Sequence, residues 1–141
     1  MSVGKKEKIN VLSLFDGISC GMIALERAGF EVENYYSSEI DKQAISISNK
    51  NYPNIKRLGS VENWKEWNID CGKIDLLIGG SPCQGFSSSG KGLNFDDPRS
   101  KLFFEFSNIL NHIKAINPNV EVKLVSVKIK EEWCDVSSEY F

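Results

Sequence analysis

Short apolar runs and amphipathic stretches alternate along the chain of 141 residues. The apolar runs are bounded by Gly, Pro, Asp or Ser, which is typical of buried strands. They predict strands over residues 9–15, 32–38, 55–58, 74–80 and 120–127. Apolar residues at helical spacing predict helices over 19–28, 41–49, 99–116 and 129–140, with a short helix or turn at 61–67.

The helix limits carry start and stop signals. Ser19 and Asp41 are the expected N-caps, and Gly29 and Pro53 are expected to end the first two helices. The long third helix is predicted to place six apolar side chains on one side: Leu102, Phe103, Phe106, Ile109, Leu110 and Ile113. The last helix rests on the spacing of Ile129, Trp133, Val136 and Tyr140.

Strands that alternate with helices predict an α/β fold, a mostly parallel sheet with helices on both faces. Central strands of such a sheet are apolar on both faces. The strand at 120–127 instead alternates, with Glu121 and Lys123 between apolar residues. Charges of this kind suit an edge strand, so we expect the sheet to stop there.

The bulk composition is that of one globular domain, with 41% hydrophobic and 26% charged residues. There is no apolar run of about 18 residues, so no membrane span is expected. Residues 1–8 are basic but lack the apolar region of a secretory signal. We expect a flexible basic N-terminus over 1–8, a folded domain over 9–141, and a cytoplasmic location.

Four cysteines are present without a CxxC pair, and His112 is the only histidine. This pattern predicts neither a metal site nor a disulfide framework. Cys20, Cys71 and Cys134 are interpreted as buried or incidental thiols.

Three predicted strand ends carry distinctive residues, and parallel sheets bind ligands beyond the carboxyl ends of their strands. The first is the turn 15–21, FDGISCG, whose glycines allow a cofactor to approach the backbone. A simple tight turn is the alternative. The second is Glu39, which is suitably placed for a ribose hydroxyl pair. A solvated loop carboxylate is the alternative.

The third strand end is the segment 79–87, GGSPCQGFS, which opens a loop to Pro98. Long loops inside compact domains are usually functional. Pro82 fixes the backbone just before Cys83, whose thiolate would be a good nucleophile in an electropositive site. A cysteine protease would need a histidine beside it, and His112 lies on a predicted helix, where a solvated or packed role is favoured.

Four segments together resemble DNA cytosine-C5 methyltransferases, over residues 9–118. They are LFDG at 14–17, SEID at 38–41, GSPCQGFS at 80–87 and DPRSKLFF at 97–104. The Pro-Cys-Gln segment is the most specific of them. The resemblance implies a Rossmann-like methyltransferase fold, S-adenosylmethionine as cofactor and DNA as substrate.

For the cofactor, the resemblance implies that Phe15 and Gly17 shape the pocket, that Glu39 binds the ribose and that Ile40 packs on the adenine. Pro82 would line both the cofactor and the flipped base. For catalysis, it implies that Cys83 is the nucleophile and that Arg99 helps to order the catalytic loop.

The chain departs from the family pattern at three places. Ser60 stands where the family has an acidic residue for the adenine amino group, so it would accept that hydrogen bond without a charge. Val125 aligns with the glutamate that contacts the cytosine ring. The chain ends at Phe141, so we expect the target-recognition domain to be absent and the fold to be incomplete at its C-terminal end.

The net charge is −2, and no basic stripe marks a phosphate-binding face. Either the DNA-binding surface lies elsewhere, for example on a complementing subunit, or this chain does not bind DNA alone. Two alternatives to a methyltransferase stay open. One is a non-catalytic remnant or subunit that binds the cofactor or a partner chain, and the other is an unrelated nucleotide-binding protein of the Rossmann type.

Overall fold

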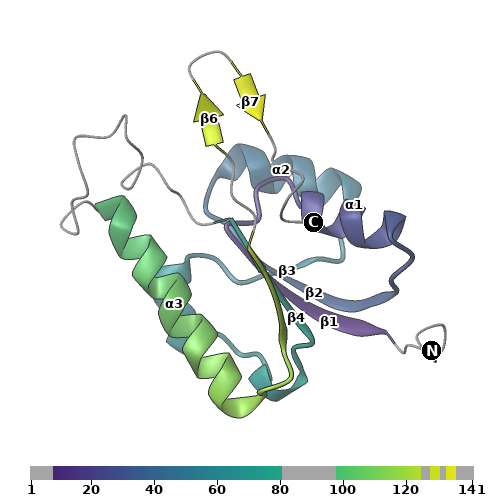
Figure 1. The fold of residues 1–141 in the computed structure, drawn as a ribbon. Helices are drawn as coiled ribbons and strands as arrows, with labels where there is room; N and C mark the ends of the chain where they lie inside the picture. Colours follow the sequence, from purple (N-terminus) through teal and green to yellow (C-terminus); the bar gives the residue numbers. More distant parts are fainter. Residues whose placement is uncertain (1–7, 81–97, 125–127, 131–132, 136–141) are drawn as a thin grey trace.

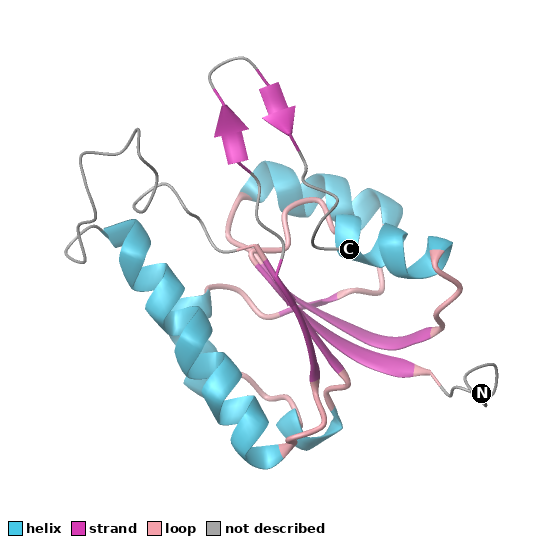
Figure 2. Cartoon of the chain, viewed as in Figure 1, coloured by secondary structure: helices cyan, strands magenta, loops and turns pink. Residues whose placement is uncertain are grey.

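A five-stranded parallel sheet forms the centre of the protein, in the strand order β3-β2-β1-β4-β5 (Figures 1 and 2). The computed structural model describes residues 8–80, 98–124, 128–130 and 133–135, with side chains over 8–80 and 101–123. The strands are β1 (Ile9–Leu14), β2 (Val32–Ser38), β3 (Lys56–Arg57), β4 (Leu76–Gly79) and β5 (Glu121–Leu124). The predicted α/β fold with a parallel sheet is confirmed, and within the described residues β5 is an edge strand, as expected.

Helices cover both faces of the sheet (Figure 1). One face carries α1 (Cys20–Arg27) and α2 (Lys42–Asn51), and the other carries α3 (Pro98–Ile116) with the 3-10 helices η2 (Val61–Glu66) and η3 (Cys71–Lys73). Side chains that alternate along β1 supply both cores. Leu12 and Leu14 belong to the core under α3, whereas Val11 packs with Leu25 of α1.

The predicted ends of α1 and α2 are confirmed in position, although the Ser19 side chain makes no capping hydrogen bond to α1. The N–H groups of Gly29 and Phe30 donate to the carbonyls of Glu26 and Leu25, which is the Schellman pattern, and Gly29 takes the left-handed conformation with φ 86°. The Asp41 carboxylate caps α2 by accepting from the backbone N–H groups of Gln43 and Ala44.

Helix α3 is fastened to the sheet at Gly79. A Cβ at this position would lie 2.2 Å from Cε2 of Phe106, so only glycine lets the buried Phe106 ring pack against the end of β4. The indole Nε1 of Trp64 in η2 donates to the Glu105 carboxylate at 2.9 Å. The centroid of the exposed His112 ring lies 5.1 Å from that of the Trp64 ring, in line with the solvated or packed role expected for it.

Two features of the C-terminal part differ from prediction. The helix predicted over 129–140 is wrong, because β6 (Lys128–Lys130) and β7 (Trp133–Asp135) pair as an antiparallel hairpin. Periodicity alone cannot decide such a short segment, and its alternating runs suit strands equally well. The α3 side chain of Phe103 is 43% exposed, unlike the buried Phe106, Ile109 and Ile113.

The described cysteines differ in their exposure to solvent. Of the thiols interpreted as buried or incidental, Cys20 is exposed, while Cys71 is half-buried, and burial raises the pKa of its thiol. The Cys134 side chain lies outside the described residues. Over the described part of the chain, no helix is long and apolar enough to cross a membrane.

Candidate functional site

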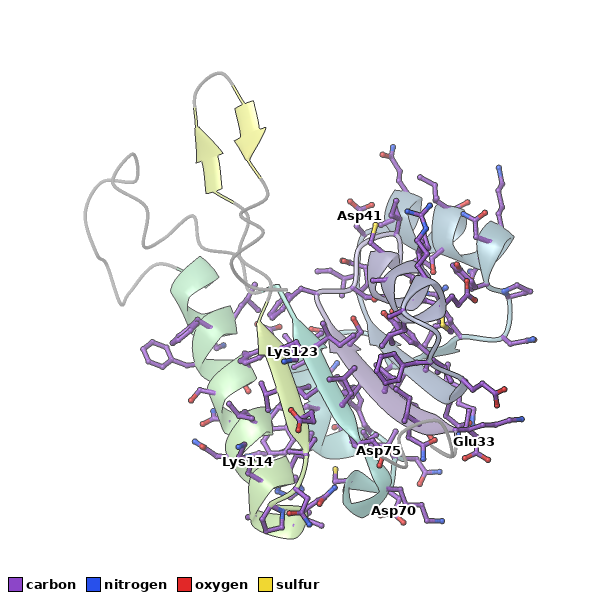
Figure 3. All side chains as sticks on the ribbon, turned by 45° about the vertical axis from the view of Figure 1, so that its right-hand side comes forward. Glu33, Asp41, Asp70, Asp75, Lys114 and Lys123 are labelled. Atoms are coloured by element: carbon purple, nitrogen blue, oxygen red, sulfur yellow. The ribbon has the colours of Figure 1, made fainter. Side chains whose placement is uncertain are left out.

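The register of the sheet brings the predicted site segments to one edge. Leu14 of β1 pairs with Ser38 of β2 and with Gly79 of β4, and Gly79 pairs with Leu124 of β5. These four strand positions therefore lie at the same end of the sheet (Figure 1). In Figure 3, Asp41 lies at this end, and Asp70 and Asp75 lie at the opposite end.

Backbone hydrogen bonds connect these segments. The N–H of Asp16 donates to the Ser38 carbonyl at 3.2 Å, and the N–H of Gly80 donates to the Leu14 carbonyl at 3.4 Å. The turn after β1, the end of β2 and the start of the segment that carries Pro82 and Cys83 are thus neighbours. Pro82 and Cys83 themselves lie outside the described residues.

Three residues of the turn after β1 take the left-handed backbone conformation. Phe15, Gly17 and Ser19 have φ of 55°, 62° and 69°. A non-glycine residue in this region costs roughly 1–2 kcal/mol, so Phe15 and Ser19 hold strain that the surroundings must offset. At Gly17 a Cβ would meet nothing within 4 Å, so the backbone angle, and not crowding, favours glycine there.

Glu39 is held against this turn by its own carboxylate. Its Oε1 accepts from the N–H of Gly17 at 2.7 Å, and its Oε2 accepts from the N–H groups of Ile40 at 2.9 Å and Asp41 at 3.1 Å. A carboxylate has roughly four lone-pair sites, so about one remains for a further donor. Three backbone donors therefore hold the Glu39 side chain in one position, although it is a half-buried residue of a loop.

Exposed apolar side chains follow both partners of the Gly17–Glu39 hydrogen bond in sequence, Ile18 after Gly17 and Ile40 after Glu39. Ile40 is 69% exposed and Ile18 is 41% exposed. An acceptor carboxylate beside bare apolar surface suits a ligand that has both hydroxyl groups and a flat apolar part.

Asp16 was not singled out from the sequence, although it lies inside the turn. Its Oδ1 accepts from the hydroxyls of Ser13 and Tyr35, each at 2.6 Å. Its Oδ2 accepts from the hydroxyl of Ser37 at 2.7 Å and from that of Ser19. The signal that could have found it is the recurrence of hydroxyl residues in β1 and β2, where buried strands are normally apolar.

The network continues to α2 and β3. The Ser19 hydroxyl also contacts the hydroxyl of Ser48, which is fully buried on α2. The Arg57 guanidinium donates to Ser48 at 2.6 Å and to Ser37 at 3.3 Å. The positive charge of Arg57 is therefore linked to the negative charge of Asp16 by two routes, through Ser37 alone and through Ser48 followed by Ser19.

Tyr35 is the most strongly perturbed member of this network. Burial, and then the negative charge of Asp16, raise the pKa of its hydroxyl far above the ordinary value. The proton stays on Tyr35 as a donor to Asp16, because ionisation would place two negative charges side by side in a buried site.

Ser60 is placed close to the same edge by its neighbours. The Gly59 carbonyl accepts from the Ser38 hydroxyl at 2.7 Å, and the N–H of Leu58 donates to the Ser37 carbonyl at 2.9 Å. The Ser60 hydroxyl accepts from the N–H of Glu62 at 3.2 Å, as the N-cap of η2. Its oxygen is thus partly engaged in holding η2.

The remaining site predictions concern residues without described side chains. Arg99 lies in the first turn of α3, which begins at Pro98 directly after residues 81–97. Val125 follows β5 and lies outside the described residues. No group of three His, Cys, Asp or Glu side chains suited to a metal ion is found within the described ranges.

Comparison with known proteins identifies the family. The family model of C-5 cytosine-specific DNA methylase matches residues 9–120. The orphan methyltransferase M.Rho11sI of Bacillus phage rho11s is 42% identical over 107 residues, which are 73% of this chain and 20% of that protein. The type II methyltransferase M.PspPI of Psychrobacter sp. (strain TA137) is 36% identical over 115 residues, which are 81% of this chain and 27% of that protein. The chain therefore spans about a quarter of the length of such relatives.

Solved structures agree with the fold. A crystal structure of a variant of Spodoptera frugiperda DNMT2 is similar with a TM-score of 0.58 and 26% identity, over 89% of this chain and 38% of that chain. The S. pombe Dnmt2 methyltransferase is similar with a TM-score of 0.61 and 21% identity, over 86% of this chain and 35% of that chain, a likeness that concerns the fold alone. The fold is the Rossmann-like one of S-adenosylmethionine-dependent methyltransferases, and the chain belongs to the family of C-5 cytosine-specific DNA methylases.

Proposed function

We propose that this chain is the part of a DNA cytosine-C5 methyltransferase that binds S-adenosylmethionine and carries the nucleophile, over residues 9–141. One observation carries the proposal. The Glu39 carboxylate is held by the N–H of Gly17, at the sheet edge where the segment with Cys83 begins. A buried parallel sheet that presents a fixed acceptor at this edge is suited to a nucleoside cofactor.

The cofactor would be bound by residues from three strand ends. Glu39 can accept one ribose hydroxyl without losing a backbone donor, and the exposed Ile40 would pack on the adenine. Phe15 and Gly17 would shape the pocket, and Ser60 would accept from the adenine amino group. The bound cofactor supplies an electrophilic methyl group, and Pro82 would line the space between it and the base.

The chain's own contribution to the reaction would be covalent catalysis by Cys83. The cytosine must first be flipped out of the duplex, at a cost of a few kcal/mol. The Cys83 thiolate would add to C6, which makes C5 nucleophilic enough to take the methyl group. Loss of the C5 proton and elimination of the thiolate from C6 would then release the product. Arg99, at the start of α3, would help to order the loop that carries Cys83.

One feature favours a second candidate, a non-catalytic remnant or a subunit that binds the cofactor or a partner chain. Val125 aligns with the family glutamate that contacts the cytosine ring, and loss of such a group costs roughly 10²–10⁴-fold in rate. The chain also spans only 20–27% of the length of the two relatives described above. We therefore propose that activity needs DNA-recognising parts in addition to residues 9–141, in the same protein or in a complementing subunit.

The experiment that tests the proposal is transfer of a labelled methyl group from S-adenosylmethionine to mixed-sequence DNA, with Cys83→Ser as the control. Transfer that disappears in the control supports the enzyme. A chain that binds S-adenosylmethionine without transferring the label supports the non-catalytic candidate. A chain that binds NAD and not S-adenosylmethionine contradicts both. A Val125→Glu variant should raise residual transfer if the alignment of β5 is right.

A further inference from the structure

We propose that Asp16 is a positioning residue for the proposed cofactor edge, because its carboxylate fixes the turn that brings the Gly17 N–H onto Glu39. The inference rests on the proposed function only for the identity of the ligand. Asp16 does not face the ligand in this account. It acts through the peptide that joins it to Gly17.

The hydrogen bonds around Asp16 require a carboxylate. Four hydroxyl groups donate to its two oxygens, from Ser13, Ser19, Tyr35 and Ser37. Only an ionised carboxylate offers roughly four acceptor sites in this space, and an amide offers two at its single oxygen. The type of residue at position 16 is therefore set by the hydroxyls that surround it.

These four donors come from three elements around the turn. Ser13 lies in β1, Ser19 is the N-cap of α1, and Tyr35 and Ser37 lie in β2. The Ser19 side chain makes no capping bond to α1 and bonds to Asp16 instead. The carboxylate thus ties both sides of a turn whose left-handed residues, Phe15 and Ser19, would relax without such restraint.

Gly17 transmits this restraint to Glu39. It directly follows Asp16, so the direction of its N–H depends on how the Asp16 backbone is held. That N–H makes the shortest of the three backbone contacts to Glu39, at 2.7 Å against 2.9 Å and 3.1 Å. A loosened turn would release Oε1 of Glu39, the oxygen that has room for a ligand hydroxyl.

The test uses Asp16→Asn and Tyr35→Phe in the full chain, with Asp70→Asn and Tyr36→Phe as controls. Asp70 caps η3 at the opposite end of the sheet, and Tyr36 neighbours Tyr35 on the other face of β2. The first readout is the NMR position of the Gly17 amide proton without ligand, with Glu39→Gln as the reference for a weakened contact. The second is the Kd for S-adenosylmethionine by calorimetry.

We expect the Gly17 amide proton of Asp16→Asn to move towards its position in Glu39→Gln, and the Kd to rise about tenfold, which corresponds to one hydrogen bond to a charged group. Tyr35→Phe should shift the Gly17 amide proton and the Kd in the same directions, but by smaller amounts. If Asp16→Asn does not fold, Tyr35→Phe provides the test. The inference is overturned if the Gly17 resonance of a folded variant coincides with that of wild type. It is also overturned if that variant and the wild type bind S-adenosylmethionine equally well. If wild type binds none, the proposed function fails for this chain, and the Gly17 resonance alone decides the inference.

Discussion

At the scale of single residues, the protein surrounds the charged Asp16 carboxylate with hydroxyl groups that donate hydrogen bonds to it. The Asp16 charge is stabilised by four donors, and Arg57 compensates it through Ser37, and through Ser48 and Ser19 in turn. Burying an ion costs several kcal/mol unless hydrogen bonds and an opposite charge offset it. The site edge and the interior are therefore coupled, since the same turn carries Asp16 inward and Gly17 towards Glu39.

The raised pKa of Tyr35 predicts a loss of stability at high pH. The folded protein holds the Tyr35 proton where the unfolded chain releases it, so this contribution is complete below about pH 10 and is lost as the pH rises further. At pH 11, ionisation of Tyr35 in the unfolded chain would lower the free energy of unfolding by about 1.4 kcal/mol. Urea unfolding at pH 8 and pH 11 should show a smaller decrease for Tyr35→Phe than for wild type, with Tyr36→Phe controlling for loss of a hydroxyl in β2. Equal decreases for wild type and Tyr35→Phe would contradict the prediction.

At the scale of elements, caps and close contacts fix how helices meet the sheet. Helix α2 starts at the Asp41 cap, immediately after Glu39, so the start of α2 and the proposed cofactor edge share one backbone segment. Helix α3 reaches the end of β4 through Phe106 and Gly79. The first contact places the start of α2 beside residues proposed for function, and the second packs the middle of α3 against the strand end that leads to Cys83.

Removal of the α2 cap should destabilise the protein. Asp41→Ala loses the acceptor for the N–H groups of Gln43 and Ala44, at an expected cost of roughly 0.5–2 kcal/mol in the free energy of unfolding. Asp41→Asn, which is an equally good N-cap residue, should stay close to wild type. Denaturant unfolding of the three proteins checks this, and an equal loss for both variants would point to the charge instead of the cap.

The contact between α3 and β4 predicts an effect of one methyl group. In Gly79→Ala the new Cβ would meet the Phe106 ring, and overpacking of this kind costs roughly 1–3 kcal/mol. A smaller partner should relieve the clash, so Gly79→Ala with Phe106→Leu should lose less stability than the two single changes added together. Strict additivity in urea unfolding would show that Phe106 is not the cause.

At the scale of the whole molecule, charge limits what the chain can bind alone. It has 17 basic and 19 acidic residues. Proteins that grip DNA neutralise several phosphates with basic side chains, so affinity falls steeply with salt. The net charge of −2 offers little of this attraction.

We therefore expect weak duplex binding by this chain, no tighter than the roughly 10⁻⁴–10⁻⁶ M of non-specific complexes at physiological salt. Fluorescence anisotropy with labelled duplex DNA at 50 and 200 mM salt would measure it. Nanomolar binding with a steep salt dependence would overturn the expectation and reveal a local basic surface that the overall charge conceals.

Much of this architecture could be predicted because its causes are local. Apolar runs and caps such as Asp41 and Gly29 act within a few residues, so the five parallel strands and α1 to α3 were predicted within a few residues of their observed limits. The segment 129–140 was not, because a hairpin of two three-residue strands and an amphipathic helix share similar apolar spacing. The side-chain roles proposed for Pro82, Cys83 and Arg99 stay predictions.

The sequence by itself determined the family, the parallel α/β fold and the segments that would meet at one sheet edge, since motif order and hydrophobic period are properties of the chain alone. Only the tertiary structure decided that Glu39 is held by Gly17, and that Asp16, Tyr35, Ser48 and Arg57 form one network. These residues are far apart in sequence, and no local pattern encodes which hydroxyl meets which carboxylate. The pairing arises when the sheet and α2 pack together, because buried polar groups must then find partners within reach.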